Sequence, residues 1–332
     1  MCAAFQPASM IQTITITEAQ VDEFQKNGVV CLRRVFGTAW LEKVARAIEL
    51  ARDSPGPQHW DKRTPGDTGR FFYEQCTYFR LPQIVEYVWR SPAAALAGVL
   101  MRASSVRYYS DHVLAKDPWS AFPTDWHQDQ PKEPVMGSQF CSVWMPTDPV
   151  ERTISLECVV GSHRWPECKT PSVVDGRMIL DRDFPRLPRI ARRRTDFDIV
   201  TFDLEPGDCI VFHCNTAHGA AGNLTDQRRW VLSTRWVGDD ARYRSSKPGS
   251  GIPGDVPWWL RDGMKFRGKR FPKVWTAARG LAPCLPRSTW TRFPSDDPAS
   301  GFWGSRRASR RWTSATSPLS AAPVPIRKVS ER

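Results

Sequence analysis

Residues 206 to 219 read PGDCIVFHCNTAHG, in which a turn signal leads into a short apolar run that ends close to a histidine. Runs of the same kind recur between residues 106 and 237, each rich in β-branched and aromatic residues and separated from the next by turn residues. Such runs are typical of β-strands, and many short strands predict a β-sandwich or barrel. The predicted strands are VRYYSDHVLAK, FCSVWMP, SLECVVGS, FDIVTFDL, CIVFHC and WVLSTRWV.

The residues before this region follow helical spacing instead. Thr17 can cap a short helix that Gly28 ends before the apolar run VVCL. Residues 39 to 52 repeat apolar positions every three or four residues and predict an amphipathic helix, and residues 82 to 101 predict a second helical region. Residues 54 to 69, rich in proline and glycine, are expected to form a loop. The sequence therefore predicts a mainly β fold with flanking helices.

The composition indicates a globular protein of a reducing compartment. The 332 residues are 41% hydrophobic, which is enough for a sizeable core, and no stretch approaches the roughly 20 apolar residues of a membrane span. The first residues lack the basic segment and apolar core of a secretory signal. Nine scattered cysteines without a CxxC pair are expected to be free thiols. We expect a cytoplasmic protein with no membrane partner, and the sequence leaves its oligomeric state open.

The net charge of +12 is concentrated at one end of the chain. Residues 278 to 332 carry ten Lys or Arg against three Asp or Glu, and so contribute +7. This segment is rich in proline and serine and buries too little apolar surface to offset its ordering entropy, so we expect disorder. The expected organisation is an N-terminal extension over residues 1 to 16, one domain over residues 17 to 277 and a basic tail over residues 278 to 332.

The run TDWHQDQ at residues 124 to 130 places an imidazole and a carboxylate two positions apart. Residues two apart in a strand face the same side, so His127 and Asp129 are expected to point together while Gln128 turns away. An HxD pair occurs often by chance, and alone it is more often a hydrogen-bonded surface pair than a metal site. A metal site at this point therefore needs a third ligand.

A third ligand is available 91 positions later at His218. Two histidines and one carboxylate on one face of an iron ion leave three coordination positions open, as in non-haem Fe(II) oxygenases. The alternative for His218 is a neutral core histidine at a strand end.

Eleven positions after His218, Arg229 opens the strand RWVLSTRWV, on which Val231 and Ser233 share its face. A guanidinium there can hold a carboxylate through two parallel hydrogen bonds. The alternative is an ordinary exposed strand arginine. The strand position selects Arg229 over its neighbour Arg228.

These residues and the stretches around them resemble the phytanoyl-CoA dioxygenase family of Fe(II)/2-oxoglutarate oxygenases. The resemblance covers about residues 17 to 275 and is co-linear, which makes it much more specific than any single motif. It implies a double-stranded β-helix, the cupin-like jelly roll, with helices outside it. The matching stretches are FQKNGVVCLRRVF, LAKDP, WHQDQ, GSHRW, EPGD, HGAAGN and RWVGDDARY.

The resemblance also implies the roles of individual residues. His127, Asp129 and His218 would be the iron ligands and the catalytic centre. Arg229 would bind the distal carboxylate of 2-oxoglutarate.

Four further residues are weaker candidates for contact with the co-substrate. Lys116 and Gln128 would lie near it, although Gln128 would have to reach around from the other strand face and Lys116 is alternatively a solvated edge residue. Trp144 stands where the family often has an aromatic residue, and core packing explains it equally well. Ala220 replaces a hydroxyl that several relatives carry two residues after the distal histidine, and Ser233 is the candidate that compensates for it.

By this resemblance the protein is an enzyme, an Fe(II)/2-oxoglutarate-dependent dioxygenase acting as a hydroxylase. Fe(II) would be its cofactor, 2-oxoglutarate and O2 its co-substrates, and ascorbate a supporting reductant. It would hydroxylate an unactivated C–H bond of a small-molecule substrate and release succinate and CO2. The sequence does not identify that substrate, because the fold and the iron site tolerate many.

Two other functions compete with this interpretation. A nucleic-acid-binding protein could act through the basic tail with an inactive cupin-like body. The complete ligand set together with Arg229 is hard to explain in such a protein, so no nucleic-acid partner is expected. An Fe/2-oxoglutarate halogenase would carry a small residue in place of a carboxylate ligand, and Asp129 argues against it.

Overall fold

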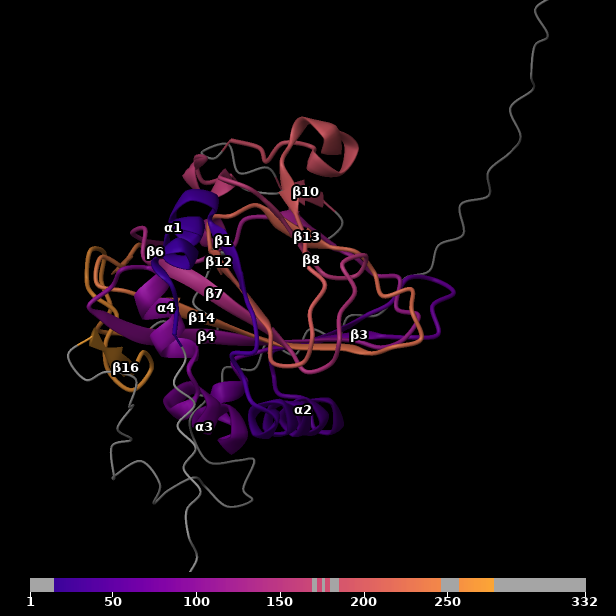
Figure 1. Ribbon diagram of the computed structural model, residues 1–332, viewed down its shortest axis with the longest axis horizontal. Coiled ribbons are helices and arrows are strands. Elements are labelled where there is room, and N and C mark those ends of the chain that lie inside the picture. Colours follow the sequence, from indigo (N-terminus) through magenta and orange to yellow (C-terminus); the bar gives the residue numbers. More distant parts are fainter. Residues whose placement is uncertain (1–14, 169–171, 175–176, 180–184, 246–256, 278–332) are drawn as a thin grey trace, which may run out of the picture. The chain divides into compact units, whose positions relative to one another are not determined.

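The computed structural model describes residues 15 to 168, 172 to 174, 177 to 179, 185 to 245 and 257 to 277. These residues fall within one compact unit, Met1–Leu285. It contains two main antiparallel sheets, and helices lie on the outer side of the larger one (Figure 1). Most of the predicted N-terminal extension and all of the predicted disordered tail lie outside the described residues.

The larger sheet has eight strands, and every pairing in it is antiparallel. One strand, β2, lies inside residues 54 to 69, so the expectation of a loop was wrong for the four residues that pair with β3. The strands in sheet order are β1 (Val29–Leu32), β12 (Cys209–His213), β7 (Phe140–Pro146), β14 (Arg229–Val237), β4 (Ser105–Lys116), β3 (Phe71–Gln75) and β2 (His59–Lys62), with β16 (Lys273–Thr276) also paired to β4.

The smaller sheet has four strands, and two further strand pairs stand apart from both sheets. Each of the six runs predicted as strands contains an observed strand. The four strands in order are β11 (Ile199–Val200), β8 (Leu156–Val159), β13 (His218–Ala220) and β5 (Thr124–His127), and the separate pairs are β15 (Arg242–Tyr243) with β6 (Val135–Met136) and β10 (Arg177–Ile179) with β9 (Ser172–Val174).

The first helix, α1 (Glu18–Asn27), begins and ends as the sequence predicts. The Thr17 side chain accepts from the backbone N–H of Gln20, and the Gln20 side chain accepts from the backbone N–H of Thr17, which is a reciprocal capping box. Gly28 ends the helix at a φ of 75°, a left-handed conformation that glycine adopts without strain. The chain then enters β1 directly.

Three further helices cover the larger sheet. The predicted helical region from 82 to 101 forms two helices rather than one, because the chain breaks at Ser91 and Pro92 and proline lacks the N–H that would continue the first helix. The helices are α2 (Thr38–Asp53), α3 (Pro82–Arg90) and α4 (Ala93–Leu100); short 3-10 helices are η1 (Thr77–Phe79), η2 (Gln130–Lys132), η3 (Ser162–Arg164), η4 (Ile190–Arg192) and η5 (Arg194–Asp196).

The central strands of the larger sheet are buried on both faces, and a hydrophobic core lies on each side of them. On the helical side, alternate residues of β14, Trp230, Leu232 and Trp236, pack with the buried faces of the helices. On the other side, Val231 of β14 packs with residues of the smaller sheet such as Leu156. Figure 1 shows the corresponding layers, with α2 and α3 below β4 and β14 and with β8 and β13 above them.

The space between the sheets also contains a cavity of about 470 Å³. Residues of the inter-sheet core, including Trp144 and Phe212, form part of its wall. Charged side chains from β14 and from the loop after β5 complete the wall. A cavity lined by both apolar and charged groups between two sheets is the natural place for a small-molecule site.

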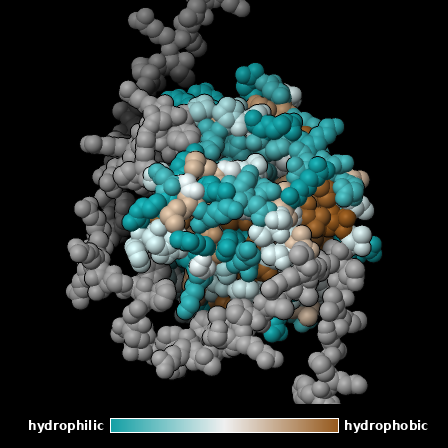
Figure 2. Space-filling view, turned by 90° about the vertical axis from the view of Figure 1, so that its left-hand side faces the viewer, coloured by the Kyte–Doolittle hydropathy of each residue, from teal (hydrophilic) through white to brown (hydrophobic). Residues whose placement is uncertain are grey.

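The outer surface is mostly hydrophilic on the face drawn in Figure 2, where one hydrophobic cluster lies near the right-hand edge. Among the described residues, no helix combines the length and apolarity needed to cross a membrane. The prediction of free thiols is confirmed for Cys31, Cys141, Cys158, Cys168, Cys209 and Cys214.

The C-terminal strand β16 separates the part of the chain that the fold needs from the part that we predict to be dispensable. Trp275 of β16 packs directly on Gly98 of α4, where even a Cβ atom would come within 2.3 Å of the indole ring. Removal of residues 280 to 332 should leave the midpoint of thermal unfolding unchanged.

A longer truncation that starts at residue 272 is the matched comparison, since it removes β16 as well. It exposes the helical core and should lower the free energy of unfolding by about 2 kcal/mol or more. Circular dichroism melts of the two truncated proteins test both statements. A shorter truncation that abolished soluble expression would mean that the tail is part of the fold.

Candidate active site

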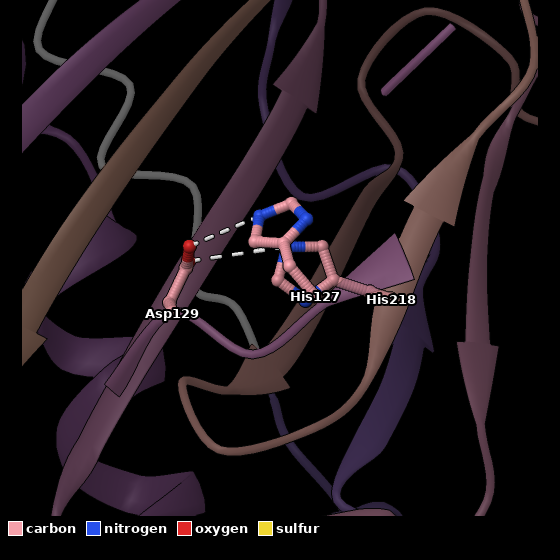
Figure 3. A group of neighbouring side chains, drawn as sticks. All are labelled: His127, Asp129 and His218. Carbon is pink, nitrogen blue, oxygen red and sulfur yellow. Dashed lines mark ion pairs between the residues drawn. The ribbon is translucent and has the colours of Figure 1, made fainter. Parts of the chain in front are cut away.

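Three side chains with metal-ligating atoms converge at the cavity. One ligand atom from each of His127, Asp129 and His218 lies within 4.8 Å of the others. The Nε2 atom of His127 is 3.4 Å from Oδ1 of Asp129, and the Nε2 atom of His218 is 3.9 Å from Oδ2 (Figure 3). Both histidines thus point toward one carboxylate, as the predicted ligand set requires.

Strand pairing explains why the two histidines meet. His127 ends β5, His218 begins β13, and the two residues are direct partners in the antiparallel register of the smaller sheet. Side chains of directly opposed residues lie on the same face of a sheet. A separation of 91 positions in sequence therefore becomes a ring centroid distance of 4.2 Å.

Asp129 reaches the site by a different route from the predicted one. Strand β5 ends at His127, and Asp129 has helical backbone angles, φ −78° and ψ −44°, immediately before η2. The backbone N–H groups of Asp129 and Gln130 both donate to the carbonyl of Cys214, at 2.8 and 2.9 Å. The expectation that strand alternation brings Asp129 beside His127 was wrong; a turn anchored on Cys214 does so.

Hydrogen bonds prepare both imidazoles to act as ligands. The Nδ1 atom of His127 lies 2.6 Å from the carbonyl of Asp125, and that of His218 lies 2.9 Å from the carbonyl of Thr216. Since a carbonyl only accepts, each Nδ1 carries the proton and each Nε2 keeps its lone pair. Burial lowers the pKa of both imidazoles, that of His218 to about 3, so they are neutral at pH 7.

The carboxylate of Asp129 is ionised despite its burial. Burial favours the neutral acid, but the nearby Arg235 guanidinium outweighs it and holds the pKa of Asp129 well below its usual range. Neutral imidazoles and one anionic oxygen donor form a set that suits a divalent first-row metal ion.

Arg229 faces the cavity from the first position of β14 and is buried. One terminal nitrogen donates to the carbonyl of Ile154, whereas Nε has no hydrogen-bond partner in the described part of the chain. Burial lowers the pKa of Arg229 to about 10, so it remains a cation at neutral pH. Arg228 faces outward, and its Nε donates to Asp148 at 2.9 Å. Of the two neighbouring arginines, only Arg229 lies on the cavity wall.

Two other candidates line the same cavity. Ser233 of β14 pairs in register with Trp144 of β7 on one side and with His112 of β4 on the other. All three side chains lie in one row on the cavity wall. Ser233 and Trp144 are therefore placed where contact with a ligand is possible.

The remaining two candidates lie beside the cavity rather than on its wall. Gln128 is buried, donates to the carbonyl of Asn215 at 2.8 Å and accepts from the backbone N–H of Cys168 at 2.7 Å, so its amide already has partners on the far side. Lys116 pairs in register with Arg229 and is fully buried, so its description as a solvated edge residue was wrong. Its Nζ donates to the carbonyl of Ala221 at 2.8 Å.

Of the charged residues on the cavity wall that the sequence analysis missed, Arg235 is the one that contacts a candidate ligand. It lies six positions after Arg229 on the same face of β14, and its guanidinium contacts Asp129. The even spacing along the strand RWVLSTRWV is the signal that could have identified it.

Comparisons with known proteins agree with this geometry. The family model described as phytanoyl-CoA dioxygenase (PhyH) matches residues 24–231. The chain belongs to the phytanoyl-CoA dioxygenase family. No curated protein matches the chain.

Solved structures show the jelly-roll fold expected of a phytanoyl-CoA dioxygenase family member. The non-heme alpha ketoglutarate dependent carbocyclase SnoK from nogalamycin biosynthesis has a TM-score of 0.62 at 20% identity, covering 78% of this chain and 97% of its own. The non-heme alpha ketoglutarate dependent epimerase SnoN from nogalamycin biosynthesis has a TM-score of 0.62 at 21% identity, and the match covers 83% of this chain and 98% of SnoN. EctD from S. alaskensis with 2-oxoglutarate and 5-hydroxyectoine has a TM-score of 0.57 at 20% identity, and the match covers 75% of this chain and 86% of EctD.

The buried Lys116 of this family member predicts a pH-dependent cost to stability. Burial and the neighbouring Arg229 lower the pKa of Lys116 to about 5, far below the value in an unfolded chain. Between these two values the unfolded chain binds a proton that the folded chain does not, so folding becomes less favourable as the pH falls. Lys116→Met should therefore stabilise the protein at pH 7, on the order of 2 to 5 kcal/mol.

Thermal melts between pH 6 and pH 10 measure this effect, and the gain should shrink as the pH rises. Lys273→Met, at an exposed position of β16, is the matched control and should show no such trend. Equal melting temperatures of the Lys116→Met variant and the unmodified protein at every pH would show that the ammonium group is solvated.

Proposed function

We propose that this protein is an Fe(II)- and 2-oxoglutarate-dependent oxygenase that hydroxylates an unactivated C–H bond of a small molecule. The observation that carries the proposal is the combination, in one cavity, of three converging ligand atoms and a buried arginine without an ion-pair partner among the described residues. A buried guanidinium without an ion-pair partner lowers the stability of a folded protein unless an anion binds to it. Membership of the family supports the same conclusion.

The donor set fits an Fe(II) ion. His127 and His218 each offer a free Nε2, and Asp129 offers an anionic oxygen. Two histidines and one carboxylate form the facial triad that leaves positions open on iron. The carbonyls of Asp125 and Thr216 hold the two rings in place. When bound, the iron would supply the oxidising chemistry, which consumes O2 and 2-oxoglutarate and yields succinate and CO2.

The cavity wall also fits 2-oxoglutarate. Arg229 would hold the distal carboxylate in a charge-assisted pair, because its Nε has no partner among the described residues and its surroundings exclude water. Ser233, four positions along the same strand face, would donate a hydroxyl in place of the one that Ala220 lacks. Trp144 would form an apolar side of the co-substrate pocket, and Lys116, the register partner of Arg229, would lie beside it as a neutral amine.

The rest of the cavity would bind the organic substrate. Its wall combines the aromatic rings of Phe71, Phe122 and Trp126 with the polar groups of Tyr73 and Gln75. A volume of about 470 Å³, shared with the co-substrate, suits a small molecule rather than a polymer. Apolar walls would hold the carbon skeleton, and the polar groups would orient the reacting C–H bond toward the metal ligands.

Asp129→Ala should abolish hydroxylation and weaken Fe(II) binding by more than about 100-fold, because it removes the anionic ligand of a dication. Anaerobic equilibrium dialysis measures the metal affinity, and succinate release measures turnover. Asp125→Ala is the matched control, since Asp125 is exposed and the variant keeps the backbone carbonyl that accepts from His127. Unchanged iron binding in both Asp129→Ala and His127→Ala would refute the metal assignment.

Arg229→Lys should raise the apparent Michaelis constant for 2-oxoglutarate by roughly ten- to a hundred-fold and leave iron affinity nearly intact. Lysine keeps the charge but loses the planar fork that matches a carboxylate. Arg228→Lys is the control, and its effect should be small because Arg228 faces outward to Asp148. If both variants had the same Michaelis constant for 2-oxoglutarate as the unmodified enzyme, the assignment of Arg229 to the co-substrate site would be refuted.

A further inference from the structure

Arg235 lies in the wall of the cavity and contacts Asp129, one of the three candidate metal ligands. It is buried on the same face of β14 as Arg229 and Ser233. One terminal nitrogen, Nη2, is 2.7 Å from Oδ1 of Asp129. No other arginine in the described part of the chain forms an ion pair with any of the three candidate ligands.

The guanidinium of Arg235 is itself held on its other side. Its Nη1 donates to Oε1 of Glu133 at 2.7 Å and to Nε2 of His112 at 3.0 Å. The second oxygen of Glu133 accepts from the hydroxyl of Tyr109 at 2.8 Å. Glu133, His112 and Tyr109 come from η2's end and from β4, so the arginine is fixed between two elements before any ligand arrives.

This arrangement divides the two oxygens of Asp129 between different tasks. Oδ1 accepts from Arg235 and lies 3.4 Å from His127 Nε2. Oδ2 faces His218 Nε2 at 3.9 Å, and no hydrogen-bond donor from the described residues contacts it. A carboxylate that is free to rotate can bind a metal ion through both oxygens, whereas one that is held at Oδ1 presents Oδ2 alone.

We propose that Arg235 is the positioning residue of the metal centre, which holds Oδ1 of Asp129 so that this ligand binds the metal ion through Oδ2 only. The proposal rests on the proposed function, because it assigns Asp129 to a metal ion. Its consequence is that one coordination position stays available to the co-substrate instead of being filled by a second carboxylate oxygen. Hydrogen-bonded partners of metal ligands commonly tune affinity and geometry in this way.

A purely structural salt bridge is the competing explanation, and it fits less well. Buried ion pairs contribute little net stability compared with apolar residues of similar size. Arg235 also contacts two carboxylates and an imidazole rather than one partner, and each contact lies on the cavity side of the sheet. Burial of these charges costs free energy, and the guanidinium points toward the candidate ligand Asp129. Both features are expected of a group that positions this ligand.

The test uses the full chain and Co(II), which replaces Fe(II) without oxidation. Titration calorimetry of Arg235→Lys and Arg235→Met gives the dissociation constant for Co(II), and the visible absorption of the bound Co(II) reports its coordination number. Arg52→Lys is the matched control, because Arg52 forms a bidentate pair with Asp117 that lies outside the cavity wall. Thermal melts of the metal-free proteins measure stability separately.

Co(II) binding should weaken about 10- to 100-fold in Arg235→Met and by less in Arg235→Lys, which keeps one donor. The Co(II) spectrum should shift toward higher coordination, and addition of 2-oxoglutarate should perturb it less than in the unmodified protein. Arg52→Lys should lose stability with no change in either metal measurement. If the methionine variant does not fold, the lysine variant decides the result.

A Co(II) dissociation constant and spectrum in folded Arg235→Lys equal to those of the unmodified protein would overturn the proposal and leave Arg235 with a structural role. Failure of the unmodified protein to bind Co(II) would instead overturn the proposed function. The two failures are therefore distinguishable.

Discussion

Strand β14 is buried on both faces, and the two-residue alternation of its side chains is the constraint on which the rest of the structure depends. Trp230 and Trp236 face the helical core, whereas Arg229 and Arg235 face the cavity. A slip of one residue would bury the arginines in the apolar core and place the tryptophans in the site. Arginines in an apolar core would lack partners for their charge, so the slipped register is unstable. A single register therefore fixes both the core and the charged wall of the cavity.

Local signals in the sequence predict the parts of the structure that depend on local chemistry. The helix between Thr17 and Gly28 has the expected caps, because hydrogen bonds between near neighbours determine them. Strand alternation places Arg228 and Arg229 on opposite faces, and the offset of eleven residues from His218 selects Arg229. The meeting of His127 and His218 could be inferred only through the family resemblance, since their cross-strand pairing depends on the topology of the whole smaller sheet.

The remaining features depend on contacts between distant segments. Asp129 adopts a helical turn because the Cys214 carbonyl, 85 positions away, accepts from its backbone, and no local pattern indicates that partner. Gln128 points away as alternation suggests, yet its hydrogen bonds to Asn215 and Cys168 are set by tertiary packing. The partners of Arg235 come from β4 and from the segment after β5, which are not neighbours in sequence.

The ligand set bridges the strands β5 and β13, and β5 is a four-residue strand at the edge of its sheet. Separation of this edge strand from its neighbour would pull the two imidazoles apart, so a cation that binds only the paired form must oppose local fraying. Metal occupancy and resistance to proteolysis are then thermodynamically linked. With iron at the candidate site, a shortage of iron in the cell would make the chain easier for proteases to cut at the same time as it emptied the site.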